Sequence, residues 1–244
     1  MRPTLVFVPG WGQSSQIWHN QSAYFSKDWP VQVVNLPGHG GVPDAPVESW
    51  LNELSNVLPQ PCILIGWSLG GMLAIQLAHY WPEKLAGLVL VSSTPCFRTK
   101  AGWTQGCSDE QFHAFEQALE HDSDKLLQQF FMLMLHGDTV SRGQFNVIAK
   151  EAVDRKHPPL PAALRSGLKL LDTLDLRDQL ADISVPTLVV HGTHDQVVPV
   201  EAGRYLAGHI PDANLHIMEC GHAPYLTQDK PFNEYLEQWC LNII

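Results

Sequence analysis

The chain has 244 residues and a net charge of −10, with 45% hydrophobic and 16% charged residues. This composition suits one large domain, or a core with an insertion, that buries a sizeable apolar interior. The negative charge disfavours nucleic acid and anionic membrane surfaces as partners, so we expect neither.

The first predicted element is the apolar run Thr4–Val8, which is followed by Pro9 and Gly10. The run is too short for the apolar region of a secretion signal. Nowhere does the sequence reach the ~20 consecutive apolar residues that a membrane-spanning helix needs. We therefore expect a cytoplasmic protein without a membrane span.

Short runs rich in Val, Ile and Leu recur along the chain and predict strands. Near-continuous apolar runs of this length are typical of strands buried on both faces of a parallel sheet. They are Thr4–Val8, Val31–Leu36, Cys62–Gly66, Leu85–Val91, Thr187–His191 and Asn214–Met218. Apolar residues at helical spacing predict helices over Leu69–Trp81 and Phe232–Leu241. Strands alternating with helices indicate an α/β fold with a mostly parallel, doubly wound sheet.

The alternation stops between Phe97 and Asp182, where the pattern is helical and no strand is convincing. Helices are predicted over Asp109–His121, Lys125–Leu135 and Gln144–Arg155, and a proline-rich break covers residues 157–161. We interpret residues 97–182 as a helical lid inserted into a core made of residues 1–96 and 183–244.

The cysteines suggest neither a disulfide framework nor a zinc site. Their number is odd, and no two of them are spaced as C-x-x-C. They are Cys62, Cys96, Cys107, Cys220 and Cys240. This usage fits a reducing compartment such as the cytoplasm.

A candidate nucleophile lies between the third predicted strand and the following helix. The sequence Gly66-Trp67-Ser68-Leu69-Gly70 fits the G-x-S-x-G pattern in the strand–turn–helix context that the pattern requires. We expect a strained backbone at Ser68, with Gly66 and Gly70 at places where a Cβ would collide with neighbouring chain. An ordinary Gly-Ser loop is the alternative, and the flanking strand and helix argue against it.

A serine hydroxyl needs a base, and His222 is the predicted one. Among 12 histidines only His222 follows the last predicted strand, in a loop where Gly221 allows the chain to turn back over the sheet. His209 and His216 fall at a predicted helix end and in a strand, which favours structural roles. His191 and His194 form an H-x-x-H pattern at a strand end without an evident third ligand, so we expect no metal site.

The predicted acid is Asp195, which follows the strand Thr187–His191. The order serine, acid, histidine is the one found where a G-x-S-x-G turn supplies the nucleophile. The other usual position follows Leu85–Val91, where Ser92-Ser93-Thr94 offers no carboxylate. A turn-capping role for Asp195 is the alternative interpretation.

Acyl transfer also needs N–H groups that stabilise the developing oxyanion. The residue after the nucleophile, Leu69, supplies one candidate. The turn after the first strand, Pro9-Gly10-Trp11-Gly12, supplies the other, which we assign to the Trp11 N–H. We expect the Trp11 side chain to form a pocket wall, although a packed surface aromatic is the simpler alternative.

Five motifs in chain order resemble those of the pimeloyl-[acyl-carrier protein] methyl ester esterases, a family with the α/β-hydrolase fold. The Gly-Trp-Gly and Gly-Trp-Ser-Leu-Gly-Gly pair is fairly specific to that family, whereas the rest are common to most α/β-hydrolases. The motifs are Val8–Gly12, Asn35–Gly40, Gly66–Gly71, His191–Asp195 and Gly221–Pro224. Asn35 stands where relatives usually have Asp, and we assign it no catalytic role.

The resemblance implies hydrolysis of a pimeloyl methyl ester held on acyl-carrier protein, by Ser68, His222 and Asp195, without metal or organic cofactor. It implies an acyl pocket under the lid, whose matching stretch is Phe130, Phe131, Met132, Leu133 and Met134. An ordinary core stripe explains this stretch equally well. We also expect a monomer.

The charge of the predicted lid fits an acidic partner. Residues 140–170 contain six basic residues and only two acidic ones, a net charge of +4 within an acidic chain. Such a patch would steer an acidic protein to the mouth of the site, although charge runs are usually solvated helix faces. The basic residues are Arg142, Lys150, Arg155, Lys156, Arg165 and Lys169.

Three other functions remain open from the sequence. A broad short-chain carboxylesterase would use the same triad and would not depend on the basic residues of the lid. A carbon–carbon bond hydrolase or lyase of this fold would ignore simple esters. A ligand receptor of this fold would react with an activated ester once without turning over.

Overall fold

The computed structural model describes residues 2–244, and its sheet is six-stranded with the order β2-β1-β3-β4-β5-β6. Every neighbouring pair of strands is parallel. The strands are β1 (Thr4–Val8), β2 (Val31–Val33), β3 (Cys62–Trp67), β4 (Leu85–Val91), β5 (Thr187–Gly192) and β6 (Ala213–Met218). The predicted doubly wound parallel sheet is confirmed.

The central strands are apolar because helices cover both of their faces. Every residue of β3 and β5 is buried, and the register places Ile65 beside Val89 and Leu90 beside Val189. Strands covered on both sides do not alternate between apolar and polar residues. The near-continuous apolar runs of the sequence therefore indicated the sheet correctly.

The second strand is shorter than predicted, because the chain leaves the sheet after Val33 rather than after Leu36. Beyond that point the Asn35 side chain accepts a hydrogen bond from the Ser15 N–H at 2.5 Å. Pro37 follows and has no N–H to offer a neighbouring strand. Asn35 thus holds the loop after β2 against the loop after β1.

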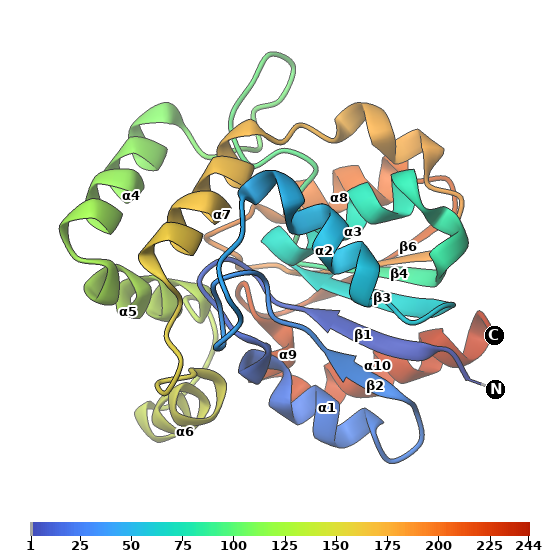
Figure 1. The fold of residues 1–244 in the computed structure, drawn as a ribbon. Coiled ribbons are helices and arrows are strands. Elements are labelled where there is room, and N and C mark those ends of the chain that lie inside the picture. The colour runs from blue at the N-terminus through green and yellow to red at the C-terminus, as the bar shows by residue number, and fades with distance from the viewer. Residues whose placement is uncertain (1) are drawn as a thin grey trace.

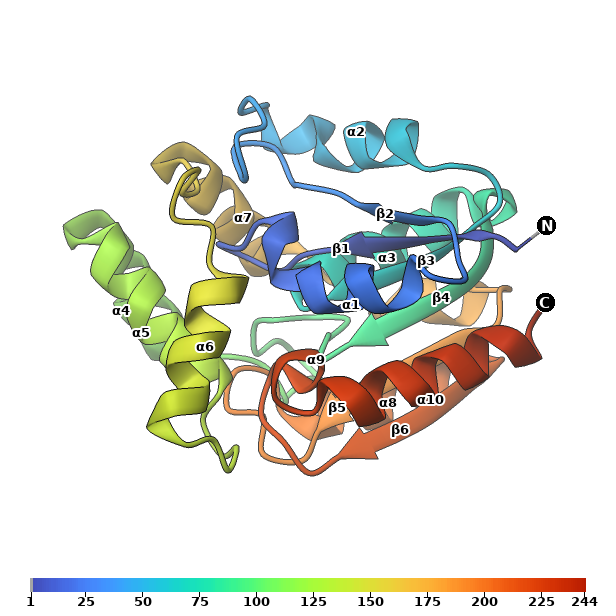
Figure 2. The same ribbon diagram turned by 90° about the horizontal axis from the view of Figure 1, so that it is seen from below.

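Helices lie on both faces of the sheet (Figures 1 and 2). On one face are α1 (His19–Phe25) and α10 (Asp229–Asn242), which contact each other, with the short α9 (Pro224–Thr227) just before α10. On the other face are α2 (Trp50–Val57), α3 (Leu69–Tyr80) and α8 (Val200–His209). No helix within residues 2–244 has the length and apolar character to cross a membrane.

Four further helices, the helical insertion, separate β4 from β5. They lie beyond the carboxyl ends of the strands, at the end of the molecule opposite the two termini (Figures 1 and 2). They are α4 (Asp109–His121), α5 (Ser123–Met134), α6 (Arg142–Ala152) and α7 (Pro161–Thr173). The sequence predicted the first three. The fourth begins at Pro161, the last residue of the predicted break, because proline suits the first helical position.

Side-chain caps set the starts of the insertion helices. Ser108 and Ser141 each accept a hydrogen bond from the third helical N–H of α4 and α6, and a glutamine at that third position returns the bond. Asp122 accepts from Lys125 N at 3.0 Å at the start of α5. These caps satisfy N–H groups that have no partner inside a helix.

Arg98 joins the first loop of the insertion to two of its helices. Its guanidinium pairs with Asp109 at 2.5 Å, pairs with Asp172 of α7, and lies 4.1 Å from the ring centroid of Phe112. The arginine side chain is mostly buried while both carboxylates face solvent. Arg98 therefore adds ion pairs between α4 and α7 to the apolar packing that these helices share.

Candidate active site

Ser68 lies on the sharp turn between β3 and α3. Its backbone has φ 54° and ψ −119°, a conformation that costs a non-glycine residue about 1–3 kcal/mol. The Ser68 N–H donates to Val91 O at 3.0 Å, and the Ser93 hydroxyl donates to Ser68 O at 2.9 Å. The strained turn predicted at the nucleophile is present, and β4 holds it in place.

The two glycines that flank the serine allow this turn to pack closely. A Cβ on Gly66 would lie 2.5 Å from the carbonyl oxygen of Gly70, and a Cβ on Gly70 would lie 2.5 Å from that of Pro9. Real Cβ atoms essentially never come within 3.0 Å of such atoms. The predicted reason for both glycines is confirmed.

His222 and Asp195 form a buried hydrogen-bonded pair. The distance from His222 Nδ1 to Asp195 Oδ2 is 2.7 Å, and both side chains are fully buried. A carboxylate can only accept, so Nδ1 carries the proton and Nε2 is left as an acceptor. Nε2 is buried without a hydrogen-bond partner among residues 2–244. Nε2 therefore forms no hydrogen bond with the Ser68 hydroxyl in this structure, and its lone pair is free to accept a proton.

The Asp195 carboxylate is held ionised. Burial alone would raise its pKa, but His222 and His191 together with the hydrogen bonds outweigh burial and bring the pKa well below its usual range. Its Oδ1 accepts from the N–H groups of Val197 at 2.8 Å and Val198 at 2.9 Å. The turn-capping role and the role of acid are therefore compatible, because one oxygen caps and the other faces His222.

Two backbone hydrogen bonds fix the loop that carries His222. The Trp67 indole Nε1 donates to His222 O at 2.9 Å, which links the loop to the residue before Ser68. The His222 N–H donates to Met134 O at 2.9 Å, which links it to the last residue of α5. The histidine loop is thus bound to the sheet and to the helical insertion at once.

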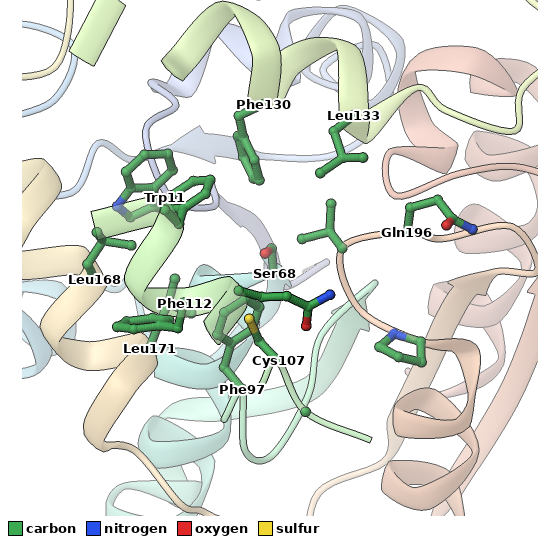
Figure 3. Close-up of a pocket in the computed structure, with 15 residues that line it drawn as sticks. Trp11, Ser68, Phe97, Cys107, Phe112, Phe130, Leu133, Leu168, Leu171 and Gln196 are labelled. Carbon is green, nitrogen blue, oxygen red and sulfur yellow. The ribbon is translucent and has the colours of Figure 1, made fainter. Parts of the chain in front are cut away.

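Ser68 lines a pocket of about 260 Å³ that is mostly apolar. Figure 3 shows Phe130 and Leu133 entering it from α5, with Trp11 beside Phe130. Trp11 meets the rings of Phe115 and Phe130 edge-on at 5.0 and 5.3 Å, and its Nε1 donates to Leu164 O at 2.9 Å. Trp11 forms the pocket wall that the sequence analysis expected.

The five residues of α5 that were predicted to bind the acyl chain lie in three different environments. Phe130 and Leu133 line the pocket. Phe131 packs against Phe145 of α6, and Met132 is 54% exposed, so neither is among the lining residues. Met134 is buried outside the pocket and contributes its carbonyl to His222. The expectation of five lining residues is corrected to two, because a helix turns only one side toward the pocket.

Several lining residues were not singled out from the sequence. They come from the segment before α4, from α4, from α7 and from the loop after Asp195. They are Phe97, Gly106, Cys107, Gln111, Phe112, Phe115, Leu168, Leu171, Gln196, Val197 and Pro199. The spacing of Phe112 with Phe115 and of Leu168 with Leu171 is the helical signal that could have found four of them.

The proposed oxyanion donors lie at two element boundaries. Leu69 is the first residue of α3, where an N–H has no partner inside the helix. Trp11 follows β1 in the turn that packs on the nucleophile, where a Cβ on Gly10 would lie 3.1 Å from that of Ser68. Both predicted donors therefore border the Ser68 turn.

The predicted partner-binding residues are on the surface of the insertion. Arg142, Lys150, Arg155 and Lys156 are all exposed. Across residues 2–244 none of these four forms an ion pair, whereas Arg165 and Lys169 pair with Glu120 and Glu48. The four remain available to an acidic partner.

The two histidines of the H-x-x-H pattern, His191 and His194, contact different residues. His191 is buried against Asp195, whereas His194 lies 3.3 Å from Glu219 at the surface. The described residues contain no group of three His, Cys, Asp or Glu side chains that could hold a metal ion. His209 and His216 stack on Tyr205 and Tyr235, in line with the structural roles expected for them.

This fold and site define a serine hydrolase of the α/β type, and comparison with known proteins agrees. The alpha/beta hydrolase fold family matches residues 3–229. An esterase from Exiguobacterium antarcticum has a similar structure, with a TM-score of 0.87 over 98% of this chain and 91% of that one, at 22% identity. That likeness shows the fold alone.

Two curated relatives narrow the family further. A pimeloyl-[acyl-carrier protein] methyl ester esterase from Nitrosomonas europaea is 38% identical, over 94% of this chain and 92% of its own length. One from Aromatoleum aromaticum is 37% identical, over 93% of each. The chain belongs to the alpha/beta hydrolase fold family, and within it to the family of these methyl ester esterases.

Proposed function

We propose that this protein hydrolyses the methyl ester of pimeloyl-[acyl-carrier protein] in biotin synthesis and releases methanol. The names of the relatives supply the substrate. The observation that carries the chemistry is the buried His222–Asp195 hydrogen bond of 2.7 Å, in a chain whose strained Ser68 turn opens into an apolar pocket. Ser68 is the nucleophile, His222 the base and Asp195 the acid that orients it.

The first half of the reaction forms an acyl-enzyme. His222 Nε2 takes the proton from Ser68 as Oγ attacks the ester carbonyl. The Trp11 and Leu69 N–H groups stabilise the oxyanion, and His222 then protonates the methoxy group so that methanol leaves. Asp195 stabilises the imidazolium that forms between these two proton transfers.

The second half releases the acid. Water attacks the acyl-enzyme carbonyl while His222 accepts its proton, and the same N–H groups stabilise the second oxyanion. Collapse of that intermediate returns the proton to Ser68 Oγ. The product is a free carboxyl group at the far end of the acyl chain, and the chain's own residues account for every proton transfer.

The pocket suits a chain of methylene groups that ends in the ester. Phe112, Phe115, Phe130 and Leu171 supply apolar surface, which favours burial of CH₂ groups by about 0.8 kcal/mol each. Polar groups of Gln111 and Gln196 also line it. We place the methylene chain against the aromatic rings and the carrier end toward these amides.

The helical insertion, residues 97–182, acts in this proposal as a lid that covers the acyl chain. Its exposed basic residues Arg142, Lys150, Arg155 and Lys156 bind the acidic carrier protein. None of these four side chains forms an ion pair within residues 2–244, so binding of the carrier protein to them would break no ion pair. Monomeric state and cytoplasmic location remain predictions of the sequence.

Growth without biotin tests the proposal. A bacterial strain that lacks its own pimeloyl methyl ester esterase is transformed with this chain or with Ser68→Ala. We expect growth from the first and none from the second at equal protein level. Failure of the unaltered, soluble chain to restore growth would contradict the substrate, and growth with Ser68→Ala would contradict the mechanism.

The surviving rival is a general short-chain carboxylesterase, which shares the triad and the pocket. It differs in one respect, because its activity would not depend on the carrier protein. Comparison of free and carrier-bound esters therefore separates the two.

A further inference from the structure

His191 is a fully buried histidine that the proposed reaction does not use. It lies near the end of β5, four residues before Asp195, and its Nε2 is 3.3 Å from Asp195 Oδ2. The same Nε2 is 2.9 Å from Val198 O. Two acceptor oxygens therefore face one ring nitrogen, so Nε2 carries the proton and donates.

The other side of the ring shows that this placement is tightly constrained. His191 Nδ1 has no hydrogen-bond partner within residues 2–244. A Cβ on Gly203 of α8 would lie 2.6 Å from Nδ1, so the ring occupies the space that a larger residue at 203 would need. The imidazole therefore has no room to shift toward α8, and its Nε2–H donates to Val198 O beside Asp195.

The Asp195 carboxylate consequently has a neighbouring donor on every side. Oδ1 accepts from Val197 N and Val198 N, while Oδ2 faces His222 Nδ1 and His191 Nε2. Val198 forms two hydrogen bonds here. Its N–H donates to the Asp195 carboxylate, and its carbonyl oxygen accepts from His191 Nε2. His191 thus fixes both the carboxylate and the turn that carries it.

We propose that His191 is a positioning residue that sets the orientation and charge of Asp195, and through it the basicity of His222. This inference rests on the proposed serine-esterase function. The Nε2 hydrogen points at Val198 O and lies close to Oδ2, where its partial positive charge offsets part of the carboxylate charge beside His222. Its removal leaves more negative charge beside His222, which then binds its proton more tightly.

Two substitutions separate positioning from simple packing. His191→Leu fills similar space and removes the donor, while His191→Gln keeps an amide N–H near the position of Nε2. The probe is p-nitrophenyl butyrate, and the active fraction is measured by titration with an organophosphate. The other titratable groups near His222 are Asp195, Cys220 on its own loop, and Asp138 beside Gly221, and both variants leave them unchanged.

For His191→Leu we expect kcat per active site to fall by about 10- to 100-fold at unchanged KM, less than the ~10⁴-fold that loss of a triad acid causes. The acidic limb of the kcat/KM profile should move to higher pH. His191→Gln should keep the profile and most of kcat. A role in packing alone would lower the melting temperature and the active fraction without moving the acidic limb, and that result would overturn the proposal.

If His191→Leu does not fold, His191→Asn takes its place, because its shorter amide cannot reach Oδ2, and the same criteria apply. Ser68→Ala in parallel tests the function on which the inference rests. An active Ser68→Ala protein would refute the triad itself. An inactive Ser68→Ala protein beside a His191→Leu protein with normal kcat and pH profile would refute only the role of His191.

Discussion

The sheet and the helical insertion hold their site residues in different ways. Ser68, Asp195 and His222 at the ends of the strands are 8%, 6% and 0% exposed, and hydrogen bonds fix each of them. On the insertion, the pocket residue Leu133 is 39% exposed, and the predicted partner-binding residues, among them Arg155, are exposed as well. Hydrogen bonds at the strand ends therefore hold Ser68, Asp195 and His222 in place, whereas the insertion combines pocket-lining side chains with exposed ones.

The two regions are nevertheless joined at the histidine loop. The last carbonyl of α5, at Met134, accepts the His222 N–H at 2.9 Å. Just beyond it, Asp138 Oδ1 accepts from the Thr227 hydroxyl at 3.0 Å. The insertion therefore holds the His222 loop as well as lining the pocket, and substitutions in either region can test the proposed roles.

The largest effect should come from Ser68→Ala. Loss of the nucleophile should reduce kcat about 10⁶-fold on every ester, because no other group forms the acyl-enzyme. The melting temperature should stay unchanged, since Ser68 is held through its backbone. Ester hydrolysis with thermal unfolding by circular dichroism measures both, and a folded variant with ordinary activity would contradict the account.

Asp195→Asn should have the second largest effect, a loss of about 10⁴-fold in kcat. The amide can donate to His222 Nδ1, which would move the imidazole proton to Nε2 and remove the acceptor that Ser68 needs. Glu219→Gln, two residues before the Gly221–His222 turn and at the surface, is the matched control and should keep full activity. Equal activity of the two variants would refute Asp195 as the acid.

A charge reversal on the insertion should affect only the carrier-bound substrate. Arg155→Glu should lower kcat/KM for the pimeloyl-carrier ester by about three- to tenfold at low salt, because like charges slow association. Activity on p-nitrophenyl butyrate should not change. Arg204→Glu, at an exposed position of α8, makes the same change in net charge and should affect neither substrate. Equal losses of kcat/KM for the carrier-bound ester in both variants would refute specific binding of the carrier protein by the basic residues of the insertion.

The smallest effect should be a pH-dependent change in stability at Asp138. Burial is the largest cause that raises its pKa, although hydrogen bonds partly oppose it. A carboxyl whose pKa is higher in the folded than in the unfolded protein stabilises less as pH rises from about 4 through the folded value. The melting temperature of Asp138→Asn relative to the unaltered protein should therefore be higher at pH 7 than at pH 4. A difference that is constant between these pH values would contradict this assignment.

The sheet could be predicted from sequence because its four central strands bury both faces and so form unbroken apolar runs. Val31–Leu36 is the exception, since Asn35 and Pro37 end the strand for a reason that depends on the loop after β1. In the insertion, α4 was predicted with its true ends, and α7 was missed although Pro161 marks its start. Prolines favour both a break and the first position of a helix, so Pro161 by itself does not distinguish a loop from the start of α7.

The site was predictable where a local motif fixes the geometry. The Ser68 turn, the position of Asp195 and the loop of His222 followed from short patterns next to strands. The lining from α4 and α7, the tie between Met134 and His222, and the contact of His191 with Asp195 depend on tertiary packing between distant segments. Helical spacing indicates the apolar side of α4 and α7, but it does not say which distant segment that side meets.

The most direct measurement compares methanol release from pimeloyl-[acyl-carrier protein] methyl ester with hydrolysis of free p-nitrophenyl butyrate. The account predicts a much higher kcat/KM for the carrier-bound ester, with a preference that decreases as salt screens the basic patch. Turnover of the free ester alone would leave the fold and the triad in place, and it would contradict the assignment of the carrier-bound methyl ester as substrate.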